Sequence, residues 1–181
     1  MNQELPKWVQ LTLVVVVVLM GLMMLMERDK LHVYATYFRE KSPEIQVRFD
    51  ELSSAMDEAA VRTHFDGVPL QCNAENGNLG DRACYSAIDR ADGMPAMTLV
   101  VFFSKGKLVR AVVQMPWWSH GTWVASLKSR YGAPQHGGTL GGWRGPVSRW
   151  TIPSGYLEMN RDRGYNPLSW SAAIWTQSLP N

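Results

Sequence analysis

The residues that could do chemistry in this chain are a serine beside a histidine, a glycine-rich run and four dispersed histidines. Ser119 precedes His120, but no Gly-x-Ser-x-Gly turn surrounds the serine and no acid is evident to orient the histidine. The run HGGTLGGWRG at 136–145 lacks the Lys-Ser/Thr ending of a phosphate loop and follows a predicted helix. No paired metal-ligand spacing links the histidines, which are His32, His64, His120 and His136. We therefore expect no enzyme, no metal site and no cofactor.

The two cysteines of the chain, Cys72 and Cys84, bracket NAENGNLGDRA, a connector that could bring two strand ends together. Closing this ring with a disulfide would contribute on the order of 3 kcal/mol in the chain-entropy model. A disulfide persists only in an oxidising compartment. The alternative is two unpaired, buried cysteines in a reducing cytoplasm. We predict the disulfide, and with it a domain outside the cytoplasm.

Tryptophan is concentrated in the C-terminal half, where seven of the eight lie between Trp117 and Trp175. Tryptophan and arginine dominate binding hot spots, because a large flat surface is buried at low entropic cost. Most of these rings are expected to fill a core, and Trp118 and Trp143 are expected to be exposed. A tryptophan platform also stacks on sugars or small apolar ligands, which keeps a small-ligand or glycan-binding module open as the alternative to protein binding.

The strands predicted near 147–160 and 107–116 alternate between two kinds of side chain. Leu157, Met159, Trp150 and Ile152 offer a face to which helices can pack. The opposite face then carries Arg149, Tyr156, Glu158, Arg110 and Gln114. A mixed aromatic and arginine surface has the composition of a protein-binding patch. The predicted partner-binding residues are therefore Trp118, Trp143, Arg149, Tyr156 and Arg110.

Two helices are predicted in the domain. Apolar residues from Ile45 to Met56 recur every three or four positions, and the cap signal Ser-Pro-Glu at 42–44 precedes them. The helix is expected to end before the Gly-x-Pro sequence at 67–69. The second helix is predicted over HGTWVASLKSRYGAP at 120–134.

Three strand candidates follow each helix. CYSAI, MTLVVFF and LVRAVVQM follow the first, and VSRWTI, GYLEMN and LSWSAAIWTQS follow the second. The helix ends also echo each other, since VRTHFDGVP at 61–69 aligns with LKSRYGAP at 127–134. We predict an α+β fold with an antiparallel sheet, made of two helix-plus-three-strand units at 45–116 and 120–178.

This element order, together with the FDGVP and YGAP helix ends, resembles the β-lactamase-inhibitor-protein fold and the related small lipoproteins of outer-membrane assembly machinery. The resemblance covers about 45–178. It implies a binding module that holds another protein with its exposed sheet face and loops. Those lipoproteins are anchored through a lipidated cysteine, whereas this chain has an apolar segment, and no residue role carries over.

The apolar segment, residues 8–26, has no charged residue in nineteen positions. As a helix it would cover about 28 Å, close to the hydrocarbon thickness of a bilayer. A cleaved signal peptide is the alternative, but the run is long and no A-x-A-like site follows it. The predicted organisation is a tail at 1–7, a single transmembrane helix at 8–26 acting as a signal-anchor, a helical stalk at 27–41 and a soluble domain at 42–181.

Charge gives two further expectations. Basic residues after the segment favour a cytoplasmic domain by the positive-inside rule, whereas the cysteine pair favours the opposite side. A formal net charge of +2, with basic residues scattered among acids, indicates no nucleic-acid partner. We expect a single-pass inner-membrane protein with a periplasmic domain. Its partners would be the lipid bilayer and another protein, as an accessory, assembly or inhibitory subunit of a cell-envelope complex.

Overall fold

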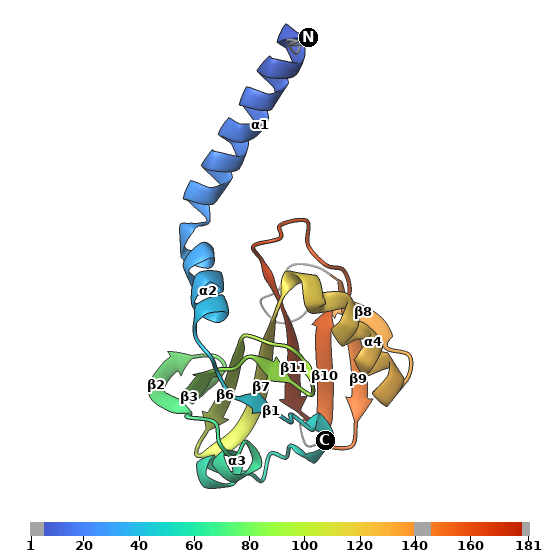
Figure 1. Ribbon diagram of the computed structural model, residues 1–181. Coiled ribbons are helices and arrows are strands. Elements are labelled where there is room, and N and C mark those ends of the chain that lie inside the picture. Colours follow the sequence, from blue (N-terminus) through green and yellow to red (C-terminus); the bar gives the residue numbers. More distant parts are fainter. Residues whose placement is uncertain (1–5, 140–145, 179–181) are drawn as a thin grey trace. The chain divides into compact units, whose positions relative to one another are not determined.

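The computed structural model describes residues 6–139 and 146–178, and the chain divides into two compact units, Met1–Arg39 and Glu40–Asn181 (Figure 1). The first unit is helical and the second combines helices with sheet. The predicted α+β class is therefore confirmed. The two units are described separately below.

The first unit consists of α1 (Lys7–Met26) and α2 (Arg28–Arg39). Helix α1 covers the predicted span 8–26, and α2 covers most of the predicted stalk. Within the described residues, however, no helix combines the length and the apolarity that crossing a membrane requires. The transmembrane part of the prediction therefore has no support from the structure.

In the described part of the second unit, eight strands form one antiparallel sheet in the order β2-β3-β6-β7-β11-β10-β9-β8. The strands are β2 (Gln71–Gly77), β3 (Gly80–Ala87), β6 (Thr98–Ser104), β7 (Lys107–Pro116), β8 (Gln135–Thr139), β9 (Pro146–Ile152), β10 (Gly155–Asn160) and β11 (Trp170–Gln177). The first half of the sheet is β2, β3, β6 and β7, and the second half is β8, β9, β10 and β11; in each half the first strand in the chain lies at the edge of the sheet. The halves meet where β7 pairs with β11.

Each domain helix is thus followed by four strands of the sheet, not by the predicted three. The missed strands are the edges, β2 and β8, whose sequences QCNAENG and QHGGT had been interpreted as a connector and a flexible run. An edge strand pairs on one side only, so its composition need not follow β-propensity. The echoed helix ends lead into these two edge strands, through Gly67 and Gly132, whose φ angles are +79° and +81°.

The first predicted helix is much shorter than expected. Residues 45–57 form β1 (Glu44–Ile45) and a 3-10 turn, η1 (Phe49–Glu51), and α3 begins only at Glu58 and ends at His64. Ile45, Val47 and Phe49 are buried while their neighbours are exposed, which is the two-residue alternation of extended chain. Helix α3 starts where Asp57 Oδ1 accepts a hydrogen bond from the Ala60 N–H, 2.9 Å away.

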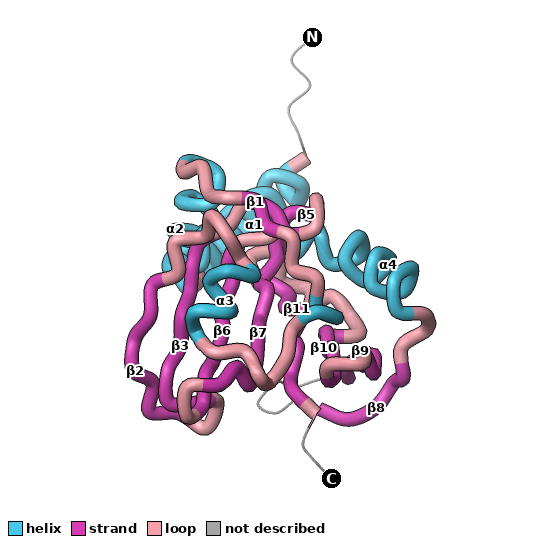
Figure 2. Tube along the Cα trace, turned by 90° about the horizontal axis from the view of Figure 1, so that it is seen from below, coloured by secondary structure: helices cyan, strands magenta, loops and turns pink. Residues whose placement is uncertain are grey.

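The other domain helix, α4 (His120–Tyr131), lies where it was predicted. Figures 1 and 2 show α3 over the half of the sheet that contains β6 and β7, and α4 beside β9 and β10. Both helices pack on one sheet face, and the main core lies between them and the sheet. Three of the clustered tryptophans, Trp123, Trp150 and Trp175, are fully buried in this core.

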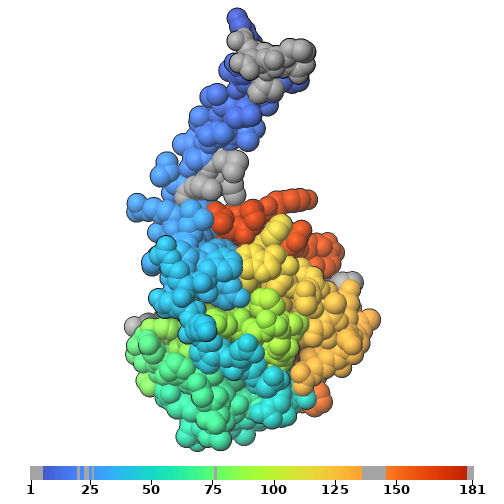
Figure 3. Space-filling model, in the orientation of Figure 1, coloured from blue at the N-terminus to red at the C-terminus, as the bar shows by residue number. Residues whose placement is uncertain are grey.

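A smaller sheet joins β1 to the hairpin of β4 (Arg90–Ala91) and β5 (Met94–Pro95) on the helical side of the domain. Figure 3 shows residues of this hairpin (lime) between the N-terminal segment of the domain (cyan) and α4 (yellow to orange). Trp123 Nε1 of α4 donates a hydrogen bond of 3.0 Å to the Pro95 carbonyl. The hairpin therefore connects the irregular segment 44–57 to the second helix.

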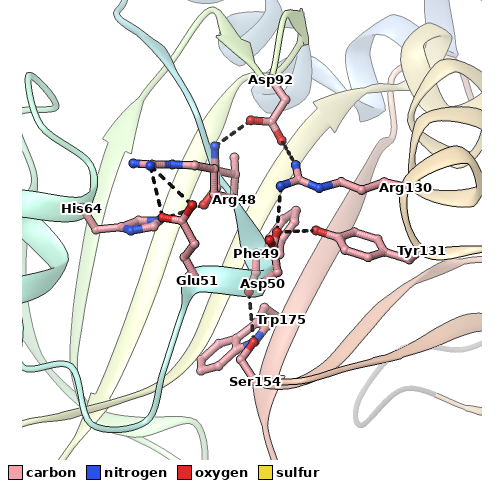
Figure 4. A network of polar contacts seen from close by, with 11 residues as sticks. Arg48, Phe49, Asp50, Glu51, His64, Asp92, Arg130, Tyr131, Ser154 and Trp175 are labelled. Atoms are coloured by element: carbon pink, nitrogen blue, oxygen red, sulfur yellow. Dashed lines mark hydrogen bonds and ion pairs between the residues drawn. The ribbon is translucent and has the colours of Figure 1, made fainter.

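A polar network on the same side joins three loops (Figure 4). Arg130 Nη2 lies 2.7 Å from Asp50 Oδ1 and its Nη1 lies 3.7 Å from Asp92 Oδ2, while the Tyr131 hydroxyl donates to Asp50 over 3.0 Å. Asp92 in turn accepts the Val47 N–H at 2.7 Å. The end of α4 is thereby fixed to η1 and to the β4–β5 turn.

The network shifts the pKa of two of its members. Partial burial raises the pKa of Asp50, but hydrogen bonds from its own backbone, Tyr131 and Arg130 outweigh this and hold it below the usual value. Burial and the hydrogen bond to Asp50 both raise the pKa of Tyr131. Neither residue lines either of the two cavities described in the second unit, and the contacts of the network connect elements of the fold.

Candidate functional site

The candidate site is the sheet face that points away from α3 and α4. Two rows of directly opposed residues cross it. The first row is Tyr85, Val100, Val112, Ile174, Glu158 and Arg149. The second row is Ala83, Phe102, Arg110, Thr176, Tyr156 and Thr151. The predicted separation of faces is correct, because Trp150, Ile152, Leu157 and Met159 all belong to the core on the helical side.

The middle of this face is apolar, which the sequence analysis missed. A second cluster of buried residues lies there, consisting of Val112, Val147, Ala172 and Ile174. Val100 and Phe102 are half-buried and pack against it. On β7, the residues of this face are Arg110, Val112 and Gln114. Because two of the three are polar, the alternation pattern indicated a polar face and Val112 was overlooked.

Arg149, Glu158 and Tyr156 form a polar group at the β9–β10 end of the face. Arg149 Nε donates to Glu158 Oε1 at 2.6 Å, and its Nη2 contacts the same oxygen. The Arg149 guanidinium also lies 5.4 Å from the centre of the Tyr156 ring. Arg149 and Tyr156 are exposed, as predicted for partner-binding residues. Glu158 was predicted to be exposed as well, and that prediction is wrong, because its side chain is 8% exposed and serves as the buried partner of Arg149.

Arg110 is half-buried on the same face, between Phe102 on β6 and Thr176 on β11. In the described part of the chain, no hydrogen bond or ion pair involves its side chain. The Thr176 hydroxyl beside it is buried and likewise has no hydrogen-bond partner. An unsatisfied buried hydroxyl therefore lies beside an arginine that has no partner among the described residues.

Trp118, one of the two predicted tryptophan sites, is not part of the face. Trp118 is 45% exposed, as expected, but it belongs to η2 (Trp117–Ser119) at the end of β7. Trp143 falls outside the described residues. Beside Trp118, the Arg163 guanidinium lies 3.6 Å from the centre of the Trp117 ring, and Tyr165 in the same loop is fully exposed. This loop is a second aromatic and arginine surface that sequence reasoning did not identify.

Cys72 and Cys84 form the predicted disulfide, with an S–S distance of 1.97 Å, between directly opposed residues of β2 and β3. Both sulfurs are bonded to each other, so the nearby Glu58 carboxylate has no thiolate with which to share a metal ion. Glu58 instead pairs with Arg62 and Arg82 at 2.8 and 2.7 Å, and their hydrogen bonds lower its pKa.

The Ser119–His120 pair has no geometry for nucleophilic catalysis. The Ser119 hydroxyl is buried and donates to the Pro116 carbonyl at 2.9 Å. His120 Nδ1 instead lies 2.8 Å from Ser171 Oγ, and burial lowers the pKa of the imidazole. A buried histidine held this way positions α4 against β11, and no substrate could reach it.

Comparisons of the chain with protein-family models, with curated proteins and with solved structures gave no match. The functional argument therefore rests on the geometry of the chain itself.

Proposed function

We propose that the second unit is a protein-interaction module that works outside the cytoplasm and is held at the inner membrane through α1. Its role would be that of an accessory, assembly or inhibitory subunit of a cell-envelope complex. The observation that carries the proposal is the composition of the sheet face opposite the helices. There, exposed Tyr85, Tyr156 and Arg149 surround half-buried Val100 and Phe102. Aromatic residues and arginine around an apolar centre are the side chains enriched in protein interfaces.

The position outside the cytoplasm is supported by the Cys72–Cys84 disulfide, because reducing systems keep cytoplasmic thiols unpaired. Attachment through α1 is supported by the sequence, since residues 8–26 carry no charge and reach about 28 Å as a helix. Within the first unit, large apolar side chains of α1 such as Leu11 and Leu25 are 68% and 71% exposed. Lipid is the partner that would cover such a surface along its whole length.

The alternative function is binding of a small ligand or glycan on an aromatic platform. Two cavities of about 320 and 410 Å³ are described in the second unit, and Tyr85 in the larger one is the only aromatic residue among their described lining. A platform for sugars uses flat rings at the binding site, and a single tyrosine offers a small stacking surface. The aromatic and arginine residues around the apolar centre of the sheet face therefore favour a protein partner over the platform.

Crosslinking and affinity capture of the full-length protein from its own membrane tests the proposal. We expect one stoichiometric protein partner, whose recovery falls several-fold in the Tyr156→Ala variant. Lys128→Ala on α4 is the matched control, because it removes an exposed side chain from the opposite side of the sheet. Recovery of no protein partner, or equal loss in both variants, would contradict the proposal.

A further inference from the structure

One of the two cavities has a composition that the proposed function leaves unexplained. It has a volume of about 320 Å³ and lies where the ends of several strands meet. Its polar lining consists of Asn78 in the β2–β3 turn, Ser104 on β6, Arg110 on β7, and Thr176 and Gln177 on β11, and Leu79 and Val109 add apolar walls. Within the described part of the chain, no acidic residue lines it.

Arg110 is the only charged residue of this lining among those described, and its charge is uncompensated. The two other arginines in the described strands of the large sheet, Arg82 and Arg149, each contact a carboxylate. Arg110 is half-buried as a residue and has no such contact, so its guanidinium is available to an anion from outside the chain.

The groups around Arg110 suit an anion rather than an apolar ligand. Thr176 lines the cavity beside Arg110, and its hydroxyl has no hydrogen-bond partner, so its capacity to donate is unused. Lys105 and Lys107 at the adjacent β6–β7 turn add positive potential at this end of the sheet. The acid beside the turn, Asp81, already accepts the Lys105 N–H at 2.7 Å.

We propose that this cavity binds a carboxylate, carried by an acidic residue of the partner protein that docks on the sheet face. A planar carboxylate matches the two parallel N–H groups of a guanidinium, and the cavity has room for an acidic side chain. Arg110 and Thr176 lie in the same cross-strand row as Tyr156, so one extended segment of the partner can reach both. The inference rests on the proposed function for the source of the carboxylate, but not for the anion site itself.

The test uses the full chain in detergent micelles and follows the Arg110 Nε–H signal by NMR. Sodium acetate and inorganic phosphate are the probes, with chloride holding the ionic strength constant. We expect acetate to shift the signal saturably. Signals of Thr176 and Gln177, followed in every variant, should show binding about tenfold weaker in Arg110→Gln, the size of effect that losing a charge-assisted hydrogen bond produces. Arg110→Lys keeps the charge and should give an intermediate affinity, which a purely structural role would not produce.

Lys105→Gln is the matched control, because it removes one positive charge from the same end without touching the lining, and it should leave acetate binding within about twofold. If Arg110→Gln does not fold, the Thr176→Val variant is used in its place. It replaces the hydroxyl with a methyl group of similar size and should still weaken acetate binding. A shift that never saturates, or equal weakening in Lys105→Gln, would overturn the anion site. Tighter binding of phosphate than of acetate would overturn the carboxylate assignment. If Arg110→Gln loses acetate binding but still forms the protein complex that depends on Tyr156, the partner's carboxylate does not use this cavity. That result would refute this inference and leave the proposed function standing.

Discussion

Replacing Arg149 with alanine should destabilise the domain far more than its exposed position suggests. The Arg149 side chain is 47% exposed, but its partner Glu158 is 8% exposed and sits within the sheet face. Removing the guanidinium leaves a buried carboxylate without its cation. From the sequence, Arg149 was predicted only as a partner-binding residue on the sheet face.

The size of the effect follows from the hydrogen bond that is lost. Hydrogen bonds to charged groups contribute about 1.5–3 kcal/mol, and orphaning the buried partner costs its desolvation. Breaking a deeply buried ion pair costs about 3–5 kcal/mol, but water can enter the space that the exposed arginine vacates, so the lower range applies here. For a domain of this size, about 4 °C per kcal/mol predicts a fall in melting temperature of roughly 6–12 °C.

Thermal unfolding of three variants and the wild type checks this reasoning. Arg149→Ala combined with Glu158→Gln should recover at least half of the lost stability, because the buried charge is gone and the two sites couple. Arg161→Ala is the matched control, since Arg161 is equally exposed at 47% but pairs with Asp162, which is 64% exposed. It should melt like the wild type. Equal melting of Arg149→Ala and Arg161→Ala, or no recovery in the double variant, would refute the account of this pair.

Three further outcomes are expected. Burial lowers the pKa of His120 below its usual 6.5, so the unfolded chain binds more protons and stability should fall as the pH drops below about 6.5. Melting curves between about pH 7.5 and 5 should show this fall in the wild type but much less in His120→Gln, and parallel curves would contradict it. Reduction of the Cys72–Cys84 disulfide should cost on the order of 3 kcal/mol in denaturant unfolding, and thiol labelling before reduction would show that the bond is not formed. A chain beginning at Ser42 should be monomeric and folded by circular dichroism, because the second unit contains its own core; its aggregation under oxidising conditions would show that the helices before it cover an apolar face.

The central strands could be predicted because their sequences alternate or are continuously apolar. The strands of the β6–β7 hairpin lie within one residue of the predicted runs MTLVVFF and LVRAVVQM, with Lys105 and Gly106 at positive φ in a two-residue turn. Helix α4 was predicted from its apolar spacing and its Gly-x-Pro end. The segment 45–57 was predicted incorrectly because Ile45, Phe49 and Leu52 fit both a helical period and an alternating one, and Val47 decides between them.

The candidate site could be predicted only in outline. The sequence placed Arg149, Tyr156 and Arg110 on the face away from the helices, because the side-chain period of a strand is two. It could not place Arg149 against a buried Glu158, nor leave Arg110 without a partner, because those contacts depend on which strands are neighbours. The pairing of β7 with β11 places Arg110 beside Thr176, and no local signal in the sequence encodes a pairing between strands so far apart in the chain.

Site-directed photo-crosslinking in the native membrane tests the central claim most directly. A photoreactive residue at position 156 reports on the sheet face, and one at position 128 reports on the exposed side of α4. The account predicts a single crosslinked protein adduct from position 156 and none from position 128. An adduct from position 128 alone, or from neither position in a membrane that contains the intact protein, would contradict a partner-binding role for this sheet face.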